Sequence, residues 1–574
     1  MKHFIIPAIL LSSLLVTSCF EDEGNYSYKH QEAPIWKIKD TENININCRV
    51  GEGEKVTFNG GDYYTWATDS LTRAAEVRYE WKINGVVFAT EPTVTMATDD
   101  FIKKAKIKSF GTSGIFGSFS IIEKETDVVY MASVMVKISQ EHDAGDWFIL
   151  SENQGNSKLS FMKRDVYKDG EVYKLRYELK NDYYQSVNGE VLQGNPISMA
   201  QTYGAQDISN KGSLTVLTDK VSCEINPITF LRTRDLKDDF SGVIPENLDV
   251  VDRQDAWGGL EGNGGLHSYI ATKDGRIFKK MMTKNNLGGN FVSSPYEVDG
   301  KGCKVTRFGS TLIGYSCIPC YDEKNRRVLA ALFFQSGETE EMFPGGPSFP
   351  AGTQFQVSKI YPVKQPAMAV PNVPAVENMP ADTEVLGMGV SGSDYVGGFF
   401  GGVSYTYIGM VYNTGGKTYF GKFGIVSDNS NPGVLGNLSK NTNIEFPGGI
   451  LDNSSVILFS GYANKQSYPK ELNNYMLYSK GSHIYCLDIS DNFAQKFDIA
   501  LEDESDKVTC MKWSVEFNTY YEQLVVGTEK GKVYCFTAVN TLKPVLLQTF
   551  DMGGKVVDVK ELYSYSDAPG RDNY

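Results

Sequence analysis

The chain has 574 residues, of which 41% are hydrophobic, 12% are aromatic and 56 are glycine. Because a single hydrophobic core stops growing at around 250 to 300 residues, this length predicts several cores in a folded protein. The formal net charge of −14 argues against nucleic acid or an anionic surface as the main partner.

The N-terminal residues have the pattern of a short secretory signal that ends at Cys19. Lys2 supplies a positive charge, residues 4–16 form an apolar run, and small residues precede the cysteine. The run is shorter than the roughly 18 residues of a membrane-spanning helix. We expect residues 1–18 to be removed as a signal peptide and Cys19 to be lipidated. The alternative is an ordinary cleaved signal with an incidental cysteine.

An acidic leader, residues 19–32, follows the signal. It places Glu21, Asp22 and Glu23 directly behind Cys19. A segment that binds anionic lipid would carry Lys or Arg there, so these acids add nothing to membrane affinity. The leader resembles the acidic export signal of Bacteroidota lipoproteins, which implies transfer to the outer face of the outer membrane. The alternative is a solvated leader that keeps the body off the membrane.

Residues 33–142 have the pattern of one small β-domain. The stretch 77–83 alternates, contains Trp81 and is followed by an Asn-Gly turn, and residues 117–122 and 129–136 predict a late hairpin. This pattern resembles the Ig-like PKD module, although the paired cysteines of antibody domains are missing. We expect Trp81 in the core of a sandwich, with a ligand platform as the alternative.

From residue 143 onward, a strand, a glycine turn and a second strand recur. Clear copies lie at 269–278, 476–485 and 524–534, and weaker ones lie at 147–161, 214–225, 314–332 and 410–420. The last two clear copies have the spacing of four-stranded blades. The fold class we predict is all-β, a PKD-like sandwich (33–142) followed by a β-propeller of about seven blades (143–574). Two further sandwiches are the alternative.

The repeat is interrupted by a proline-rich insertion around residues 343–381. Proline removes ladder donors and favours extended, polyproline-like backbone. We expect a long segment draped over the body, which serves a partner or a ligand mouth or is an exposed connection.

The cysteines do not have the spacing of a small disulfide scaffold. Cys317 and Cys320 have the form of a redox pair, but the flanking residues predict strands instead of the helix that such a motif opens. A local disulfide between them, or two packed thiols, is the expectation. Cys486 and Cys535 occupy matching places in two repeated hairpins and are expected as buried thiols.

The sequence contains no catalytic motif that we can identify. HExxH, paired Cys-x-x-Cys, Gly-x-Ser-x-Gly and P-loop patterns are all missing. We therefore expect no enzyme, no metal and no cofactor. A propeller hydrolase that assembles carboxylates from separate blades is the alternative.

Aromatic, glycine-rich loops are the candidate ligand contacts. Aromatic rings stack on sugars or receive apolar peptide side chains, and glycine lets the backbone approach closely. The same residues also suit blade corners. The candidates are Trp257, Tyr183, Tyr184, Tyr395, Phe399 and Phe400.

The leader, the PKD-like domain and the β-rich body together resemble the PKD-like lipoproteins of gut Bacteroidota. The resemblance implies a lipid-anchored protein on the extracellular face of the outer membrane. It also implies a SusC-like TonB-dependent transporter and a SusD-like lipoprotein as partners. The protein would then be an accessory subunit that binds oligopeptides, or less favourably glycans, and the alternative is a surface hydrolase.

Overall fold

The chain divides into two compact units, and each is described by itself. Within the described part of the chain, no helix has the length and apolar character that a membrane crossing requires. The computed structural model describes residues 32–39, 41–50, 53–68, 70–107, 114–139, 146–170, 172–202, 213–227, 229–257, 266–282, 290–311, 317–336, 339–341, 348–350, 355–398, 401–459, 475–514, 523–537 and 544–562.

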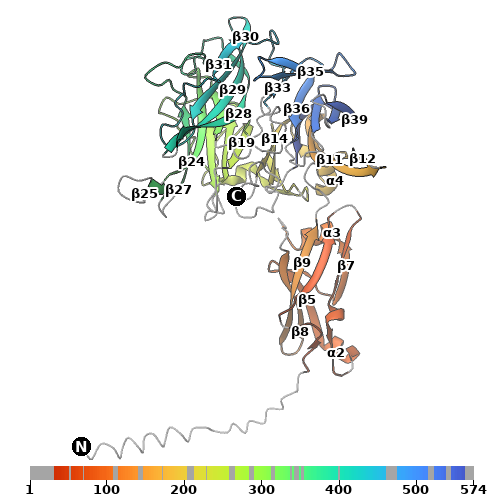
Figure 1. Ribbon diagram of the computed structural model, residues 1–574. Coiled ribbons are helices and arrows are strands. Elements are labelled where there is room, and N and C mark those ends of the chain that lie inside the picture. The colour runs from red at the N-terminus through yellow and green to blue at the C-terminus, as the bar shows by residue number, and fades with distance from the viewer. Residues whose placement is uncertain are drawn as a thin grey trace, which may run out of the picture. The chain divides into compact units, whose positions relative to one another are not determined.

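The described residues from 32 to 139 form a sandwich built on a five-stranded sheet of order β2-β9-β8-β5-β6 (Figure 1). Two small sheets, β3-β7 and β1-β4, accompany it. The elements are β1 (Ile35–Trp36), β2 (Ile44–Arg49), β3 (Lys55–Asn59), η1 (Gly60–Tyr63), β4 (Tyr64–Thr65), α2 (Ser70–Glu76), β5 (Val77–Ile83), β6 (Val86–Ala89), β7 (Thr93–Ala97), α3 (Thr98–Lys104), β8 (Ile115–Glu123) and β9 (Val129–Ser139).

Both predicted hairpins of the sandwich are confirmed. Asn84 and Gly85 join β5 to β6 with φ values of 48° and 78°, the left-handed pair that a tight hairpin turn requires. Trp81 is 1% exposed, and its ring centroid lies 4.3 Å from that of Phe119 and 5.3 Å from that of Phe58. The interpretation of Trp81 as sandwich core is therefore correct.

The described residues of the second unit contain seven sheets that we call blades 1 to 7. In each, strands that follow one another in the chain lie next to each other, the order of a propeller blade. Figure 1 shows this part of the chain in colours running from orange to blue. Blade 1 comprises β40 (Val556–Glu561), β10 (Trp147–Asn153), β11 (Asn156–Asp169) and β12 (Val172–Lys180), and blade 2 comprises β14 (Pro196–Thr202), β15 (Ser213–Thr218), β16 (Cys223–Ile225) and β17 (Arg232–Asp235). Blade 3 comprises β19 (Val250–Trp257), β20 (Leu266–Thr272) and β21 (Ile277–Met282), and blade 4 comprises β23 (Cys317–Asp322), β24 (Arg327–Ser336) and β27 (Phe355–Pro362).

Blades 5 to 7 have four strands each, and a few short elements lie within or between the blades. Blade 5 comprises β28 (Glu384–Gly398), β29 (Gly401–Thr414), β30 (Lys417–Val426) and β31 (Thr442–Glu445). Blade 6 comprises β32 (Ile457–Phe459), β33 (Tyr475–Lys480), β34 (His483–Asp488) and β35 (Ala494–Ala500). Blade 7 comprises β36 (Val508–Trp513), β37 (Gln523–Thr528), β38 (Lys532–Thr537) and β39 (Val545–Asp551). The short elements are α4 (Tyr183–Asn188), β13 (Leu192–Gln193), η2 (Leu236–Asp239), β18 (Phe240–Ser241), β22 (Phe291–Val292), β25 (Thr339–Glu341) and β26 (Ser348–Pro350).

The ring of blades closes through the last strand of the chain. β40 pairs antiparallel with β10, the first strand of the propeller, so Val559 lies opposite Ile149. Blade 1 is thus built from both ends of the propeller sequence. The prediction of an all-β chain with a sandwich and a propeller of about seven blades is confirmed by this arrangement.

The seven predicted repeat copies lie in the seven blades. Each copy forms the middle hairpin of its blade, for example β20–β21 and β37–β38. The reason is burial on both faces: every residue of β37 is buried, since neighbouring blades cover both sides of a middle strand. Such strands carry the strongest apolar signal in the sequence.

The proline-rich segment, over its described residues 348–350 and 355–381, combines a strand, exposed positions and a packed connection. β27 within it is a regular strand of blade 4, paired with β24. Beyond this strand, Val363, Val370, Val376 and Met379 are buried in the same hydrophobic cluster as residues of blades 4 and 5. Prolines in this segment therefore shape a packed connection whose apolar side chains fill the space between two blades.

Candidate functional site

The innermost strands of the propeller surround a central cavity of about 940 Å³. Every blade contributes to its wall: the inner strands are β40, β14, β19, β28, β32 and β36, and in blade 4 the segment 306–311 takes this place. Phe308 of that segment bridges to Cys320 of β23, and Ser310 bridges to Gly389 of β28. The cavity is thus a product of ring closure, with most of its wall residues on strands.

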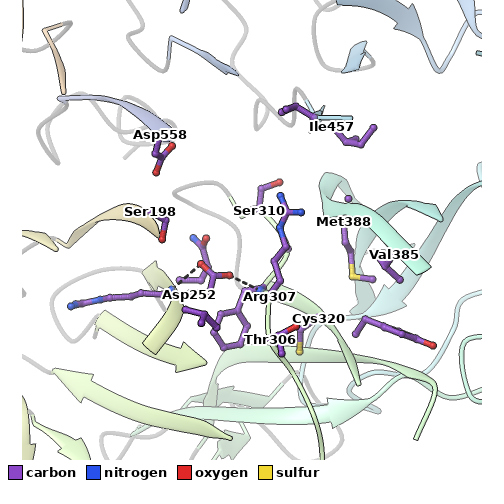
Figure 2. A pocket seen from close by; sticks show the side chains of 18 of the residues that line it. Ser198, Asp252, Thr306, Arg307, Ser310, Cys320, Val385, Met388, Ile457 and Asp558 are labelled. Carbon is purple, nitrogen blue, oxygen red and sulfur yellow. Dashed lines mark hydrogen bonds between the residues drawn. The ribbon is translucent and has the colours of Figure 1, made fainter. Parts of the chain in front are cut away.

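The wall of the cavity has an apolar side and a charged side. Val385 and Met388 of β28 and Ile457 of β32 form the apolar side, and Figure 2 shows them opposite Ser198, Asp252 and Asp558. The charged side also contains Lys512 of β36 and Lys560 of β40. A ligand in this space meets hydrocarbon on one side and charges of both signs on the other.

Two of the cavity carboxylates, Asp252 and Asp558, are held by backbone N–H groups. Phe308 N donates to Asp252 Oδ2 at 2.7 Å, and Arg253 N donates to Oδ1 at 2.8 Å. Met199 N donates to Asp558 Oδ2 at 2.8 Å. Each carboxylate therefore ties its own inner strand to that of the next blade. Burial raises the pKa of Asp252, and the Phe308 hydrogen bond and the Arg307 charge oppose that rise.

Lys512 and Lys560 are partly exposed to the cavity, and neither has a carboxylate within the 4.0 Å of an ion pair among the described residues. Burial, together with the Lys512 charge, lowers the pKa of Lys560. Asp558, Asp255 and Asp252 act on Lys560 in the opposite direction. The lysines and aspartates of the cavity wall thus interact electrostatically without forming ion pairs with one another.

A second group of charged side chains, between blades 2 and 3, forms ion pairs and is largely buried. Glu224 lies 3.1 Å from Arg253 and 2.6 Å from Arg234, and Arg234 lies 3.0 Å from Asp239, which also pairs with Lys280. Burial would raise the pKa of Glu224, but Arg253, Lys280 and Arg234 lower it to about 2. We call these five residues the buried ion cluster. Its charges satisfy one another, so it joins two blades.

Neither group has the composition of a metal centre. The described residues contain no group of three His, Cys, Asp or Glu side chains that is placed to hold a metal ion.

Several predicted site residues lie outside the described residues. These are Cys19, Glu21, Asp22, Glu23, Phe399 and Phe400. Trp257 is the last residue of β19, and its side chain is likewise outside the described part. Their predicted roles in lipidation, export and ligand contact stay predictions.

Of the other predicted aromatic contacts, two pack in the interior and one lies on a strand. Tyr184 is fully buried in α4 and its hydroxyl donates to Glu190 Oε1 at 2.8 Å, so the expectation of an exposed loop is wrong for this residue. The Tyr183 ring centroid lies 4.7 Å from that of Phe230. Tyr395 is 61% exposed on β28, where its ring covers Gly402. None of the three lines the central cavity.

The expectation of a possible Cys317–Cys320 disulfide is wrong, because both residues lie on the extended strand β23 as free, buried thiols. Side chains three positions apart on a strand point to opposite faces. Cys317 accordingly packs in the core shared with blade 5, while Cys320 packs in the core shared with blade 3. Two packed thiols, the other possibility, is what the structure shows. The predicted burial of Cys486 and Cys535 is confirmed.

Comparison with known proteins adds a family for the N-terminal part. Residues 19–196 match the PKD-like family. The match includes the sandwich and continues through β10, β11 and β12 of blade 1. The family resemblance seen in the sequence is therefore supported over this part of the chain. The sequence has no match among curated proteins.

Solved structures with some similarity include propellers of different function. A quinoprotein alcohol dehydrogenase-like protein from Bacteroides thetaiotaomicron has 13% identity and a TM-score of 0.35, covering 92% of this chain and 99% of that one. PorZ, a surface component of the type IX secretion system of Porphyromonas gingivalis, has 11% identity and a TM-score of 0.31, covering 92% and 78%. The six-bladed fucose-binding lectin of Aleuria aurantia has 7% identity and a TM-score of 0.26, covering 78% and 94%. The propeller itself is defined by the seven blades described above.

Proposed function

We propose that this protein is a lipid-anchored lipoprotein on the outer face of the outer membrane, where its propeller binds oligopeptides for a SusC/SusD-type importer. The observation that carries the binding role is the central cavity, whose apolar side faces fixed charges of both signs. A short peptide has the matching chemistry: apolar side chains, an ammonium end and a carboxylate end. The cavity volume of about 940 Å³ lies in the range of sites for small ligands.

The composition of the cavity wall favours peptides over glycans. Sugar sites in proteins rely on exposed aromatic faces and neutral hydrogen-bonding groups. Among the described residues, Phe308 and Tyr321 are the aromatic side chains of the wall, and Phe308 is only 6% exposed. Charged side chains such as Lys512 and Asp558 gain little electrostatic stabilisation from an uncharged sugar. The alternative of a glycan-binding protein is therefore the weaker one.

A cavity-filling variant tests peptide binding. Ile457→Trp places a large ring on the apolar side of the cavity, and we expect it to reduce peptide capture at least tenfold. Ile444→Trp is the matched control, because Ile444 is 37% exposed on the outermost strand of blade 5. The measurement is mass spectrometry of peptides bound after equilibrium dialysis of the detergent-solubilised protein against a tetrapeptide pool. Equal peptide capture by both variants and the wild type would contradict a binding role for the cavity.

The anchor and the partners are tested in cells. Cys19→Ala is expected to abolish incorporation of labelled palmitate, and replacing Glu21, Asp22 and Glu23 by Ala to protect the protein from protease added to intact cells. Affinity purification of the wild-type lipoprotein should retrieve a TonB-dependent barrel and a SusD-like lipoprotein. Protease resistance of the wild type itself would contradict surface exposure.

A surface hydrolase is the second candidate, and one observation favours it. Burial raises the pKa of Asp252 in the cavity, a condition that a carboxylic acid needs to donate a proton at neutral pH. If the purified protein cleaves peptides or polysaccharides and Asp252→Asn abolishes the cleavage, the hydrolase replaces the binder. Stable, uncleaved peptides recovered from the cavity would support the binder.

A further inference from the structure

Two lysines emerge side by side from the charged side of the cavity. Hydrogen bonds join β36 and β40, the inner strands of blades 7 and 1, near both of their ends. At one end, Thr509 Oγ1 donates to the Val556 carbonyl; at the other, Ser514 Oγ donates to Glu561 Oε1 at 2.6 Å. Lys512 and Lys560 lie between these two contacts and line the cavity. The pair is therefore held in place by backbone that cannot separate without opening the ring.

The described residues supply no ion-pair partner for these two lysines. Neither ammonium group forms an ion pair among the described residues, as noted above. Two carboxylates of the same cavity, Asp252 and Asp558, are held in place because each accepts backbone N–H groups on both oxygens, and a third, Asp255, lies 3.2 Å from Arg253. Two cations held next to each other, partly out of water, are unfavourable unless an anion joins them.

The charges around the lysines restrict which anion fits. Asp252, Asp255 and Asp558 lie within electrostatic reach of Lys560. A multiply charged anion such as a phosphate would be repelled by these three carboxylates. A single carboxylate on a ligand that also carries an ammonium group satisfies both signs at once. Within a peptide, the C-terminal carboxylate has this chemistry.

We propose that Lys512 and Lys560 together hold the C-terminal carboxylate of a bound oligopeptide. The apolar side formed by Val385, Met388 and Ile457 then receives a side chain of the same peptide. This inference rests on the proposed function, because it assigns an orientation to a ligand in the same cavity. It gives the site a specificity for free C-termini, and it distinguishes degraded peptides from internal segments of folded proteins.

The experiment compares two tetrapeptide pools of equal composition, one with free and one with amidated C-termini. Binding to the detergent-solubilised full-length protein is measured by equilibrium dialysis and mass spectrometry. For the wild type, we expect amidation to weaken binding roughly 10-fold or more, as for loss of a charge-assisted contact. For Lys512→Met/Lys560→Met, we expect both pools to bind equally, at the level of the amidated pool on the wild type.

Controls separate charge from folding and from overall electrostatics. Lys480→Met/Lys507→Met removes two exposed lysines outside the cavity and should keep the wild-type preference for free C-termini. Lys512→Arg/Lys560→Arg should retain most of that preference, because the charge remains. Thermal unfolding of each variant verifies that the propeller is intact.

The outcomes distinguish this inference from the proposed function. Equal binding of both pools to the wild type would overturn the role of the lysines while leaving peptide binding in place. Binding of neither pool would remove the proposed function and this inference with it. Competition by inorganic phosphate at concentrations where acetate has no effect would overturn the assignment to a carboxylate.

Discussion

The propeller contains two groups of charges that differ in how they are satisfied. In the buried ion cluster between blades 2 and 3, Glu224 is in direct contact with Arg253 and Arg234; Glu224 and Arg253 are buried, while the Arg234 side chain is 39% exposed. On the cavity wall, Lys512 and Lys560 are within reach of carboxylates but touch none of the described ones. The buried ion cluster contributes to the packing between two blades, whereas the cavity lysines leave their charge available for a ligand.

One strand contributes to both groups. On β19, Asp252 takes part in the cavity wall while the Arg253 guanidinium is fully buried in the cluster. Successive side chains of a strand point to opposite faces, so this inner strand places one side chain in the cavity wall and the next one between two blades. Substitutions in the two groups should therefore differ in kind, the first affecting folding and the second affecting binding.

The largest effect is expected for Glu224→Gln. The change keeps the size of the side chain but leaves Arg253, Arg234 and Lys280 with less than their opposing charge. Breaking a buried ion pair in this way costs about 3–5 kcal/mol. Urea denaturation followed by tryptophan fluorescence should show the corresponding drop in the free energy of unfolding. Glu445→Gln, in the exposed pair with Lys417 at 2.6 Å, is the matched control and should stay near the wild type.

The same residue predicts a response to acid. Because the pKa of Glu224 is lowered to about 2 in the folded protein, its contribution is fully present above the ordinary carboxyl pKa and is lost as the pH falls toward 2. Thermal unfolding between pH 5 and pH 2 should show a steeper loss for the wild type than for Glu224→Gln. Parallel loss in both proteins would mean that other carboxylates control the acid response.

An opposite effect is expected at Lys422, a buried lysine of β30 with no ion pair among the described residues. Burial, with the Lys440 charge, lowers its pKa to about 8. Replacing it by Met removes a charge that the fold holds at a cost, so we expect a gain of roughly 1–3 kcal/mol at pH 7. Lys417→Met is the control, because Lys417 lies 2.6 Å from Glu445 and is 51% exposed, so its removal should bring no gain.

The pH dependence gives an independent measurement of the same group. A folded pKa near 8, below that of the unfolded chain, means that the wild type gains stability as the pH rises from about 8 toward 10.5. Lys422→Met should lack this gain in thermal unfolding experiments. If the variant is less stable than the wild type at every pH, the contact of Lys422 with the Tyr407 ring outweighs the cost of burial.

The fold was predictable from the sequence because the middle hairpins of the blades are buried on both faces. Residues such as Leu524, Val525 and Val526 form an uninterrupted apolar run between glycine turns, and this pattern recurs in each blade. The innermost strands lack such a pattern. The stretch 251–255 is polar and resembles a loop, although it forms the cavity wall.

The cavity was not predictable for a related reason. Its wall takes three to six residues from each of eight separate segments, and only ring closure brings Lys512 and Lys560 beside Asp252. The aromatic residues that the sequence favoured as ligand contacts are better explained by packing. Tyr184, for example, has a large ring that fills a blade core, with its hydroxyl satisfied by Glu190.

A small effect on stability is expected for Lys512→Met/Lys560→Met. Because these lysines form no ion pair among the described residues, removing them should change the free energy of unfolding by less than about 1 kcal/mol, or increase it. Urea denaturation of this variant beside Glu224→Gln measures the difference between the two groups of charges directly. A loss as large as that of Glu224→Gln would mean that the cavity lysines hold the ring together.

The smallest effect is expected from reducing agents. Cys317 and Cys320 lie on opposite faces of β23, so their thiols cannot meet without breaking the strand, and both are buried. Alkylation with iodoacetamide in denaturant, without reductant, should label both cysteines completely, as peptide mass spectrometry would show. The thermal unfolding temperature should be the same with and without dithiothreitol. Incomplete labelling that reductant restores would show a disulfide and a different path for blade 4, since the pairing of Cys317 with Leu332 and of Cys320 with Leu329 would have to change.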